Sequence, residues 1–399
     1  MNRLWNFALA LILGVFLFSV AGAEKEVMFG GELFSSWYYD MSDSLTDFGN
    51  RSYVRFDNYN RFQVTRAYLT GKAKLSDRTY GRISSDVNPS YNYIRLKYGY
   101  VGWAFLRSEK LDLGANMGLV ENPYIYNMDE IWGRRYISMT PGEMSWNQDA
   151  PGMQSSADFG LSFWGKFGED GKVGKAFISF FNGPGYTETD ENNPTKDVDF
   201  TIFLNPLNAQ PGLEESKIGF QFSTGKVNAY NDSSDIEDYY KMSILSFMGD
   251  LRYRKLFNIG LEYNGYTSPY ILDVLNTGLY YFDFDDSSDV KVSSLSIFGA
   301  LWFGELMPDS RALQTLDLFF RYVMLDPDTD DHDDIGYPSP AGTEPYEVKA
   351  TQMIIGLECA PVEGFKSSLN FQSDKIKDRG AGLNNVTNSY LYLNMGLWF

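Results

Sequence analysis

The fold is decided by the stretch FQVTRAYLTGKAKLSDRTYGRISSDVNPSYNYIRLKYGYVGWAFL, residues 62–106. Apolar and polar residues alternate in it with period two, and the alternation is interrupted only at 76–78 and 89–90. This pattern predicts three neighbouring strands, each with one apolar face and one polar, charged face. Because no second apolar layer is found to cover the apolar face, we interpret the strands as the wall of a transmembrane barrel, with lipid outside and water inside.

The alternation recurs along the whole chain. About sixteen segments show it, although 173–181, 241–254 and 347–359 alternate poorly; the others are 28–38, 61–75, 78–88, 91–106, 110–118, 158–167, 196–205, 216–223, 256–265, 290–303, 315–325, 365–374 and 388–399. Long and short connections mostly alternate, as expected for external loops and periplasmic turns, and all 15 prolines fall between segments. The sequence therefore predicts an all-β fold, a transmembrane antiparallel barrel of about 16 strands.

The first residues have the features of a secretory signal peptide. Residues 1–23 contain Arg3, an apolar core at 7–18 and an A-x-A sequence at 21–23. A membrane anchor is the alternative, but the apolar core is short for it. We expect residues 24–399 to form a single outer-membrane β-barrel domain. Without residues 1–23, 33 basic and 52 acidic side chains remain, and this charge of −19 excludes a nucleic-acid binder that works by bulk charge.

The last segment, 388–399, is amphipathic and ends in Phe399. Such a strand is similar to the targeting signal that the outer-membrane barrel assembly machinery reads in bacteria. The alternative is an ordinary last strand of a soluble sandwich. We therefore expect the chain to reside in the bacterial outer membrane, in contact with the lipid bilayer and lipopolysaccharide.

Basic residues gather on the predicted inner face of the first strands. If facing residues of antiparallel strands point to the same side, Lys72 lies across from Arg82, and Arg82 across from Lys97, with Thr70, Ser84 and Arg95 in the next row. This row predicts a preference for anions. Screening by carboxylates, or a register slip of two residues, is the alternative. The residues expected to line the pore are Arg66, Lys72, Arg82, Arg95 and Lys97.

The longest predicted loop, 119–157, is the third external loop. In porins this loop typically folds into the lumen and forms the constriction. Arg134 and Arg135 are therefore candidates to narrow the pore electrostatically. The alternative is that they only pair with Asp129 and Glu130.

Much of the acidic charge falls in the predicted loops. The sequence DPDTDDHDD, residues 326–334, is a candidate for binding calcium or for bridging divalent ions to lipopolysaccharide. It lacks the fixed spacing of a calcium hand, which favours the alternative of a solvated charged loop. The single histidine, His332, lies in this loop and is a poor candidate for catalysis. We expect no enzymatic activity, no cofactor and no metal centre.

The segment 62–88 resembles the N-terminal hallmark of the phosphate-selective porin O and P family. The residues that carry the resemblance are Arg66, Ala67, Leu69, Lys74, Gly81 and Asp86. LDLGANMGLVENPY at 111–124 and FNGPGYTETDENNPTKDVDF at 181–200 look like later segments of that family. The resemblance implies a 16-stranded, trimeric outer-membrane channel. The arginine ladder expected for phosphate selectivity is only partly present, in Arg66, Arg82 and Arg95.

The sequence thus predicts a porin for passive diffusion of small hydrophilic solutes, with a modest preference for anions and phosphate as one candidate. Two alternatives remain open. One is a structural or adhesive barrel that conducts nothing. The other is a sugar-specific channel, favoured if luminal tyrosines form a stacking track.

Overall fold

A computed structural model describes part of the chain at residue level. The described residues are 26–42, 47–48, 51–52, 59–88, 93–144, 153–183, 185–187, 195–228, 239–268, 290–326, 348–378 and 386–399. The predicted signal peptide, residues 1–23, and most of the acidic loop 326–334, including His332, lie outside them. No described helix is long and apolar enough to cross a membrane.

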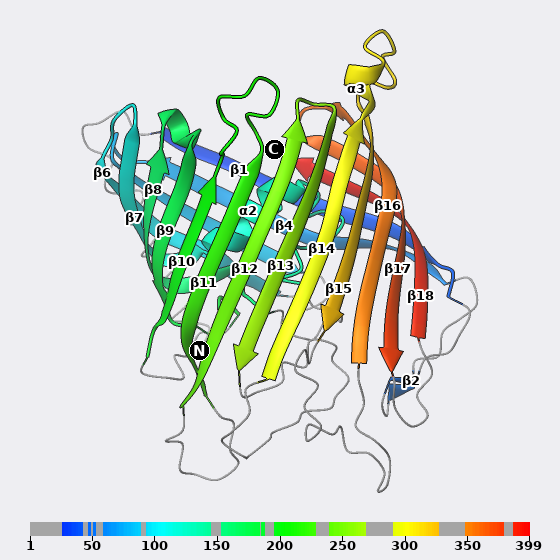
Figure 1. The fold of residues 1–399 in the computed structure, drawn as a ribbon, viewed down its shortest axis with the longest axis horizontal. Coiled ribbons are helices and arrows are strands. Elements are labelled where there is room, and N and C mark those ends of the chain that lie inside the picture. The colour runs from blue at the N-terminus through cyan, green and yellow to red at the C-terminus, as the bar shows by residue number, and fades with distance from the viewer. Residues whose placement is uncertain are drawn as a thin grey trace, which may run out of the picture.

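Sixteen antiparallel strands form a closed barrel (Figure 1). They are β1 (Glu26–Asp40), β4 (Asn60–Lys74), β5 (Thr79–Asn88), β6 (Tyr93–Leu106), β7 (Leu111–Glu121), β8 (Ala157–Phe167), β9 (Gly174–Phe181), β10 (Asp197–Leu204), β11 (Lys217–Asn228), β12 (Tyr239–Tyr253), β13 (Phe257–Ser268), β14 (Val290–Trp302), β15 (Leu316–Asp326), β16 (Val348–Val362), β17 (Phe365–Asp378) and β18 (Val386–Trp398). Each strand pairs with its sequence neighbour, and β1 pairs with β18, which closes the sheet. All sixteen predicted strands are confirmed.

Smaller elements lie in the connections. They are β2 (Asp47–Phe48) paired with β3 (Arg51–Ser52), the helix α2 (Pro123–Trp132), the short 3-10 helix η1 (Glu169–Gly171) and the short helix α3 (Phe303–Leu306). Short connections such as 75–78, 107–110, 254–256 and 363–364 lie at the end of the barrel where α3 lies (Figure 1). The third long connection, residues 122–156, contains α2; we call it loop 3.

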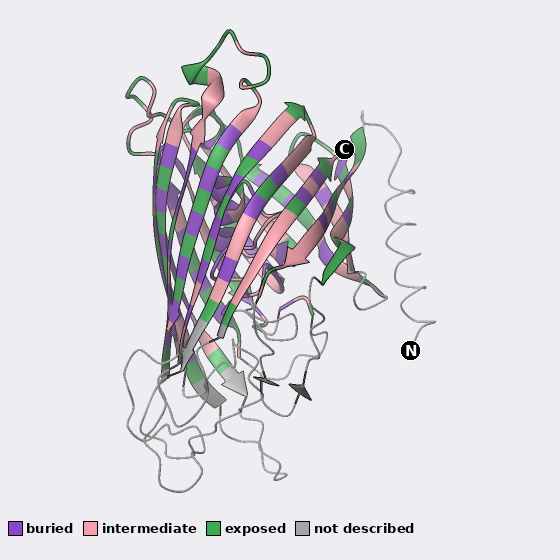
Figure 2. Ribbon diagram, turned by 90° about the vertical axis from the view of Figure 1, so that its right-hand side faces the viewer, coloured by how far each residue is buried: buried purple, intermediate pink, exposed green. Residues whose placement is uncertain are grey.

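The two faces of the wall differ as the alternation predicts. Exposed and buried residues follow each other along the strands in Figure 2. In β4, Leu69 is 58% exposed whereas Tyr68 is buried, and in β11 the side chain of Phe222 is exposed whereas Gln221 is buried. The outward apolar residues form the band that contacts lipid in a transmembrane barrel.

One strand boundary differs from the prediction. The sequence pattern predicts a turn at 360–364, whereas β16 continues to Val362 and contains Pro361. The pairing with β17 shifts between Cys359 and Val362, so Pro361 lies in a β-bulge. Proline is tolerated there because a bulged residue is not required to donate a ladder hydrogen bond.

The inner wall is less polar than predicted. A cluster of buried apolar side chains lies inside the barrel, on strands β10, β12, β14, β15 and β16; its wall residues are Phe203, Met248, Phe298, Ala300, Phe319 and Ile354. An inner wall exposed to the water of a channel would have polar side chains instead of such a cluster. The cluster therefore marks the part of the inner wall that is covered by another element, and that element is loop 3.

Candidate channel constriction

Helix α2 lies inside the barrel, and its ends are fixed by local sequence. Asn122 caps the first turn, because its Oδ1 accepts hydrogen bonds from the backbone N–H groups of Tyr124 (3.0 Å) and Ile125 (3.3 Å). Pro123 occupies the first helical position, where its missing N–H costs nothing. Gly133 ends the helix in the left-handed conformation with φ 65°, which favours glycine.

One face of α2 is buried against the barrel wall. Tyr124, Ile125 and Met128 are fully buried, and Trp132 makes edge contacts with the rings of Phe298 and Phe319. These side chains recur every three or four residues, which is the spacing of one helix face. Hydrophobic contact therefore holds α2 against strands β10 to β16 and leaves its opposite face toward β4 to β6.

Arg134 anchors loop 3 to the wall instead of facing the lumen. Its Nη2 donates to Asp317 Oδ1 at 2.7 Å, its Nε lies 3.4 Å from Glu358 Oε2, and its guanidinium lies 4.9 Å from the ring centre of Phe319. The residue is 5% exposed. The interpretation of Arg134 as a pore-narrowing residue is therefore corrected, because two wall carboxylates neutralise it in a buried position.

Three wall cations also bind backbone carbonyls of loop 3. Arg321 Nη1 donates to the carbonyl of Met139 at 2.7 Å, Arg252 Nη2 to that of Ile131 at 3.3 Å, and Lys366 Nζ to that of Gly133 at 3.2 Å. The last two contacts lie at the C-terminal end of α2, where the helix dipole favours positive charge. Sequence reasoning missed these anchors.

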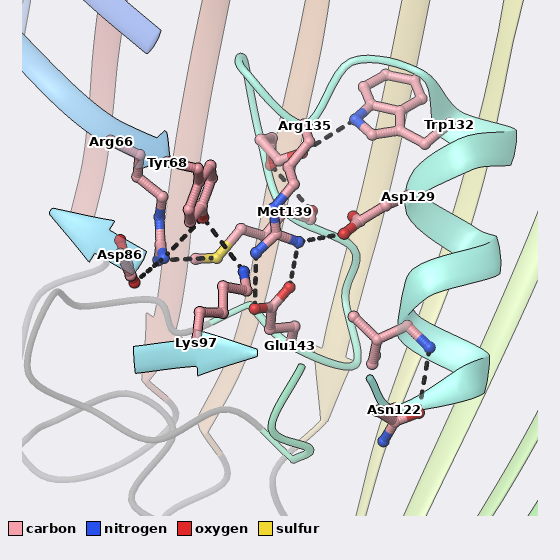
Figure 3. A network of polar contacts seen from close by, with 12 residues as sticks. Arg66, Tyr68, Asp86, Lys97, Asn122, Asp129, Trp132, Arg135, Met139 and Glu143 are labelled. Carbon is pink, nitrogen blue, oxygen red and sulfur yellow. Dashed lines mark hydrogen bonds and ion pairs between the residues drawn. The ribbon is translucent and has the colours of Figure 1, made fainter. Parts of the chain in front are cut away.

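Arg135 holds the inner edge of loop 3 together. Its guanidinium forms hydrogen-bonded ion pairs with Asp129 and Glu143, the latter through both nitrogens of its fork (Figure 3). The predicted pairing with Asp129 is confirmed, whereas Glu130 lies 3.8 Å from Lys175 instead. Asp129, Glu130 and Arg135 border the open space between α2 and β4 to β6.

A second polar group lies on the opposite wall (Figure 3). Arg66 Nη1 lies 3.3 Å from Asp86 Oδ2, which also accepts a hydrogen bond from the Tyr186 hydroxyl at 3.0 Å. Lys97 is 3% exposed; its Nζ donates to the Tyr68 hydroxyl at 3.2 Å and lies 4.6 Å from the centre of that ring. Aromatic rings therefore hold the Lys97 cation at the edge of the lumen.

The predicted cation row is right in one contact and wrong in the other. Lys72 faces Arg82, as predicted. Arg82, however, faces Tyr100. The pairing of β5 with β6 is slipped by two residues from the predicted register, and a β-bulge that leaves Lys97 without a ladder partner between Leu96 and Tyr98 shifts it by one more. The slip of two residues alone places Arg95 opposite Asp86 instead of Ser84, so this alternative to the predicted row is confirmed. The predicted pair Thr70 and Ser84 is present.

Two adjoining cavities lie between loop 3 and the wall. The first, of about 950 Å³, is bordered by Tyr68, Lys97 and Tyr98 on the wall and by Asp129 and Arg135 on loop 3. The second, of about 570 Å³, lies toward the short turns. Both are lined by Arg82, Tyr126 and Glu130, so they meet at these three residues. We take this junction as the candidate constriction.

The second cavity is basic. Its charged lining residues are Lys72, Lys74, Arg82, Arg107, Lys166 and Lys175 against Asp112, Glu121 and Glu130, which gives a formal charge of +3. Arg82 lies 2.6 Å from Glu121. Within the described part of the chain, Lys72, Arg107 and Lys166 have no carboxylate within ion-pair distance. The prediction missed Arg107, Lys166 and Lys175 as site residues, although the inward position of Lys166 follows from the alternation of β8.

Asp129 and Glu143 respond differently to burial beside the same arginine. Burial raises the pKa of Asp129 to about 6, an effect that Arg135 opposes and Glu143 reinforces. Burial also acts to raise the pKa of Glu143, but the charge and hydrogen bonds of Arg135 outweigh it and lower that pKa below its ordinary value. Glu143 therefore stays ionised when Asp129 takes up a proton.

We expect ion selectivity to change with pH around 6. Protonation of Asp129 removes a negative charge from the first cavity, so anion permeability should rise relative to cation permeability between about pH 7.5 and about pH 5. Docking of loop 3 raises the pKa of Asp129, so the docked loop binds the proton more tightly than a solvated loop would. The free energy that holds loop 3 against the wall therefore falls as the pH rises through about 6. The measurement is the reversal potential in a KCl gradient at each pH.

Asp129→Asn provides the control for this pH dependence. The variant should show the low-pH selectivity of the wild type at all of these pH values. A variant profile as steep as that of the wild type would contradict the assignment to Asp129.

Comparisons with known proteins concern the fold. No protein-family model matches the sequence, and no curated protein matches it. Among solved structures, the outer membrane channel DcaP of Acinetobacter baumannii is similar with a TM-score of 0.61 at 12% identity, over 94% of this chain and 97% of that one. The outer membrane protein OmpT of Vibrio cholerae in its trimer form gives 0.56 at 10%, over 94% and 100%, and Salmonella typhi OmpF in complex with daunomycin gives 0.56 at 10%, over 94% and 97%.

These similarities cover nearly the whole of each chain. The apolar outer band and polar interior agree with the location of these relatives in the outer membrane. The chain therefore has the fold of bacterial outer-membrane channels and spans that membrane as a 16-stranded β-barrel.

Proposed function

We propose that the chain is a porin, a passive diffusion channel for small hydrophilic solutes that modestly favours anions. The observation that supports this proposal most directly is the basic cavity beside the candidate constriction, with its formal charge of +3. Fixed positive charge along a narrow passage raises the local concentration of anions and lowers that of cations. The negative charge of the whole chain does not oppose this effect, because distant charges are screened within about 8 Å at physiological ionic strength.

The test is a planar-bilayer recording of the purified protein. We expect stable conductance steps and, in a KCl gradient, a reversal potential on the anion-selective side. Absence of conductance would instead favour a structural or adhesive barrel whose lumen is filled by loop 3. A cation-selective reversal potential would contradict the anion preference while leaving the channel in place.

A general anion preference fits the site better than phosphate specificity. Two of the three arginines that resemble the ladder of phosphate-selective porins are largely neutralised by ion pairs. Arg66 Nη1 lies 3.3 Å from Asp86 Oδ2, and Arg82 Nη1 lies 2.6 Å from Glu121 Oε1. A phosphate ion would have to compete with these carboxylates. The same recording with added phosphate separates the two cases, since a phosphate-specific site predicts that phosphate blocks the chloride current and a general anion channel does not.

The remaining expectations are part of the same proposal. We propose a homotrimer, in line with the trimer form of the OmpT relative, and light scattering of the detergent-solubilised protein measures it. Residues 1–23 are proposed to be a signal peptide, and 388–399 a strand read by the assembly machinery. Lipopolysaccharide contact and calcium binding at 326–334 stay predictions, as does the absence of enzymatic activity.

A further inference from the structure

Four tyrosines gather at the loop end of strands β18, β1 and β4, away from the candidate constriction. The ring of Tyr38 lies 5.5 Å from that of Tyr392, 6.0 Å from that of Tyr390 and 5.9 Å from that of Tyr59. The rings of Tyr390 and Tyr392 are 5.7 Å apart. We call these four residues the tyrosine strip.

Strand alternation places the core of this strip inside the barrel. On β1, Ser36 is buried, and Tyr38 lies two residues further on the same face; on β18, Asn394 is buried, and Tyr392 and Tyr390 follow on its face. Leu393, between them, is exposed on the outside. Tyr38 faces Tyr392 directly in the ladder between β1 and β18. The strip therefore lies on the luminal side of the barrel seam.

Polar side chains flank the strip on both sides. On β4, Arg61 lies 5.6 Å from the centre of the Tyr38 ring and donates from Nε to Gln63 Oε1 at 3.1 Å. On β17, Gln372 faces Tyr390 and donates from Nε2 to Asp374 Oδ2 at 2.9 Å. Amide, carboxylate and guanidinium groups thus border the rings, with their orientations set by bonds to one another.

This combination matches the chemistry of a sugar ring. A pyranose has faces of C–H groups, which are attracted to the negative face of an aromatic ring, and an edge of hydroxyls, which bind planar amide and carboxylate groups. The planes of neighbouring rings are inclined by 38° and 51° at Tyr392, and by 56° and 84° between Tyr38 and its neighbours Tyr59 and Tyr390, so the strip presents both ring faces and ring edges. Arg61 already supplies the cation that contacts Tyr38.

We propose that the tyrosine strip binds carbohydrate, so that sugars or short oligosaccharides are collected at the external mouth before they reach loop 3. The proposal rests on the proposed porin function and adds a substrate class to it. Binding there is weak, because a solute that is to pass must also leave the strip. The ends of β1, β4, β17 and β18 hold the rings on regular strands and so fix the geometry of the strip.

The test measures block of the single-channel ion current by maltohexaose, a linear glucose oligomer, added on the loop side. Tyr390→Ala with Tyr392→Ala should raise the half-blocking concentration about tenfold, because two stacking rings are lost. Tyr390→Phe with Tyr392→Phe keeps both rings and should stay near the wild type. Tyr39→Ala, next to Tyr38 but on the opposite face, is the matched control and should leave the block unchanged.

The outcomes separate this inference from the porin proposal. A protein that conducts no ions refutes the porin proposal itself. Conductance that maltohexaose does not block, or blocks no better than a polyethylene glycol of equal mass, refutes carbohydrate binding while the porin stands. Equal block in the double alanine variant and the wild type shows that sugar binds elsewhere and overturns the assignment to the strip. Stronger block by tetraethylammonium than by maltohexaose would assign the rings to cations.

Discussion

Arg135→Ala should release the inner edge of loop 3 and increase the single-channel conductance. The change leaves Asp129 and Glu143 close together in a buried position without the cation that neutralises both. Removing one partner of a buried ion pair typically costs about 3–5 kcal/mol, because the remaining charge stays unpaired. That free energy opposes the docked loop, not the strands, so we expect faster hydrogen exchange in 123–144 without unfolding of the barrel.

The matched control is the triple variant Arg135→Met, Asp129→Asn and Glu143→Gln, which removes all three charges together. Replacement of a whole buried charge group by neutral side chains is often neutral for stability, so this variant should restore exchange protection in loop 3. Arg135→Ala with wild-type conductance and wild-type exchange would show that the hydrophobic contacts of α2 alone hold the loop.

Lys72→Glu combined with Lys166→Glu should reverse the ion selectivity. Both side chains line the basic cavity, and neither has a carboxylate partner among the described residues. The double change leaves four cations and five anions in the lining, a formal charge of −1 in place of +3. Since a unit charge at 4 Å is worth about 1 kcal/mol even in water, the anion-to-cation permeability ratio should fall about fivefold or more. The measurement is the reversal potential in a KCl gradient.

Lys110→Glu with Lys255→Glu is the matched control, because it makes the same change in net charge at exposed turn residues outside both cavities. It should leave the permeability ratio close to the wild-type value. A shift equal to that of the cavity variant would show that overall charge, and not the cavity lining, sets selectivity. Lys97 is a poor choice for such a test, because aromatic rings enclose it and a glutamate there would disturb their packing.

The strands were predictable because one face of each strand contacts lipid. Every second residue therefore has to be apolar, and this alternation is visible in the sequence. The segments that alternate poorly are equally informative. In 241–254 and 347–359, the inward residues Met248 and Ile354 are apolar because loop 3 packs on them. In these two segments, weak alternation therefore marks the inner wall that loop 3 covers.

The β-bulge at Lys97 is visible in the sequence as a change in the parity of the outward apolar residues. A prediction that assumes one uniform register along β6 does not use this change. Outward apolar residues fall on even numbers at Ile94 and on odd numbers at Val101 and Trp103. A strand whose outward residues change parity must contain one extra residue between them. The position of that residue within 95–100 does not follow from the pattern, since several of these side chains suit either face.

The partners of Arg134 could not be predicted from the sequence. Asp317 is 183 residues away, and local sequence carries no information about which of many carboxylates a loop arginine meets after it folds inward. The acidic neighbours Asp129 and Glu130 were closer in the chain and equally suitable in charge. Contacts of this kind depend on the closed shape of the whole barrel.

The docking of α2 on strands β10 to β16 has a consequence for the order of events during biogenesis. A helix of ten residues is too short to persist in water, since isolated helices under about 12–15 residues are marginal. Its surface of contact is not complete until β16, more than 200 residues later, has joined the sheet. Residues 123–132 are thus synthesised early and ordered late, and a fluorophore on this helix would report completion of the cylinder.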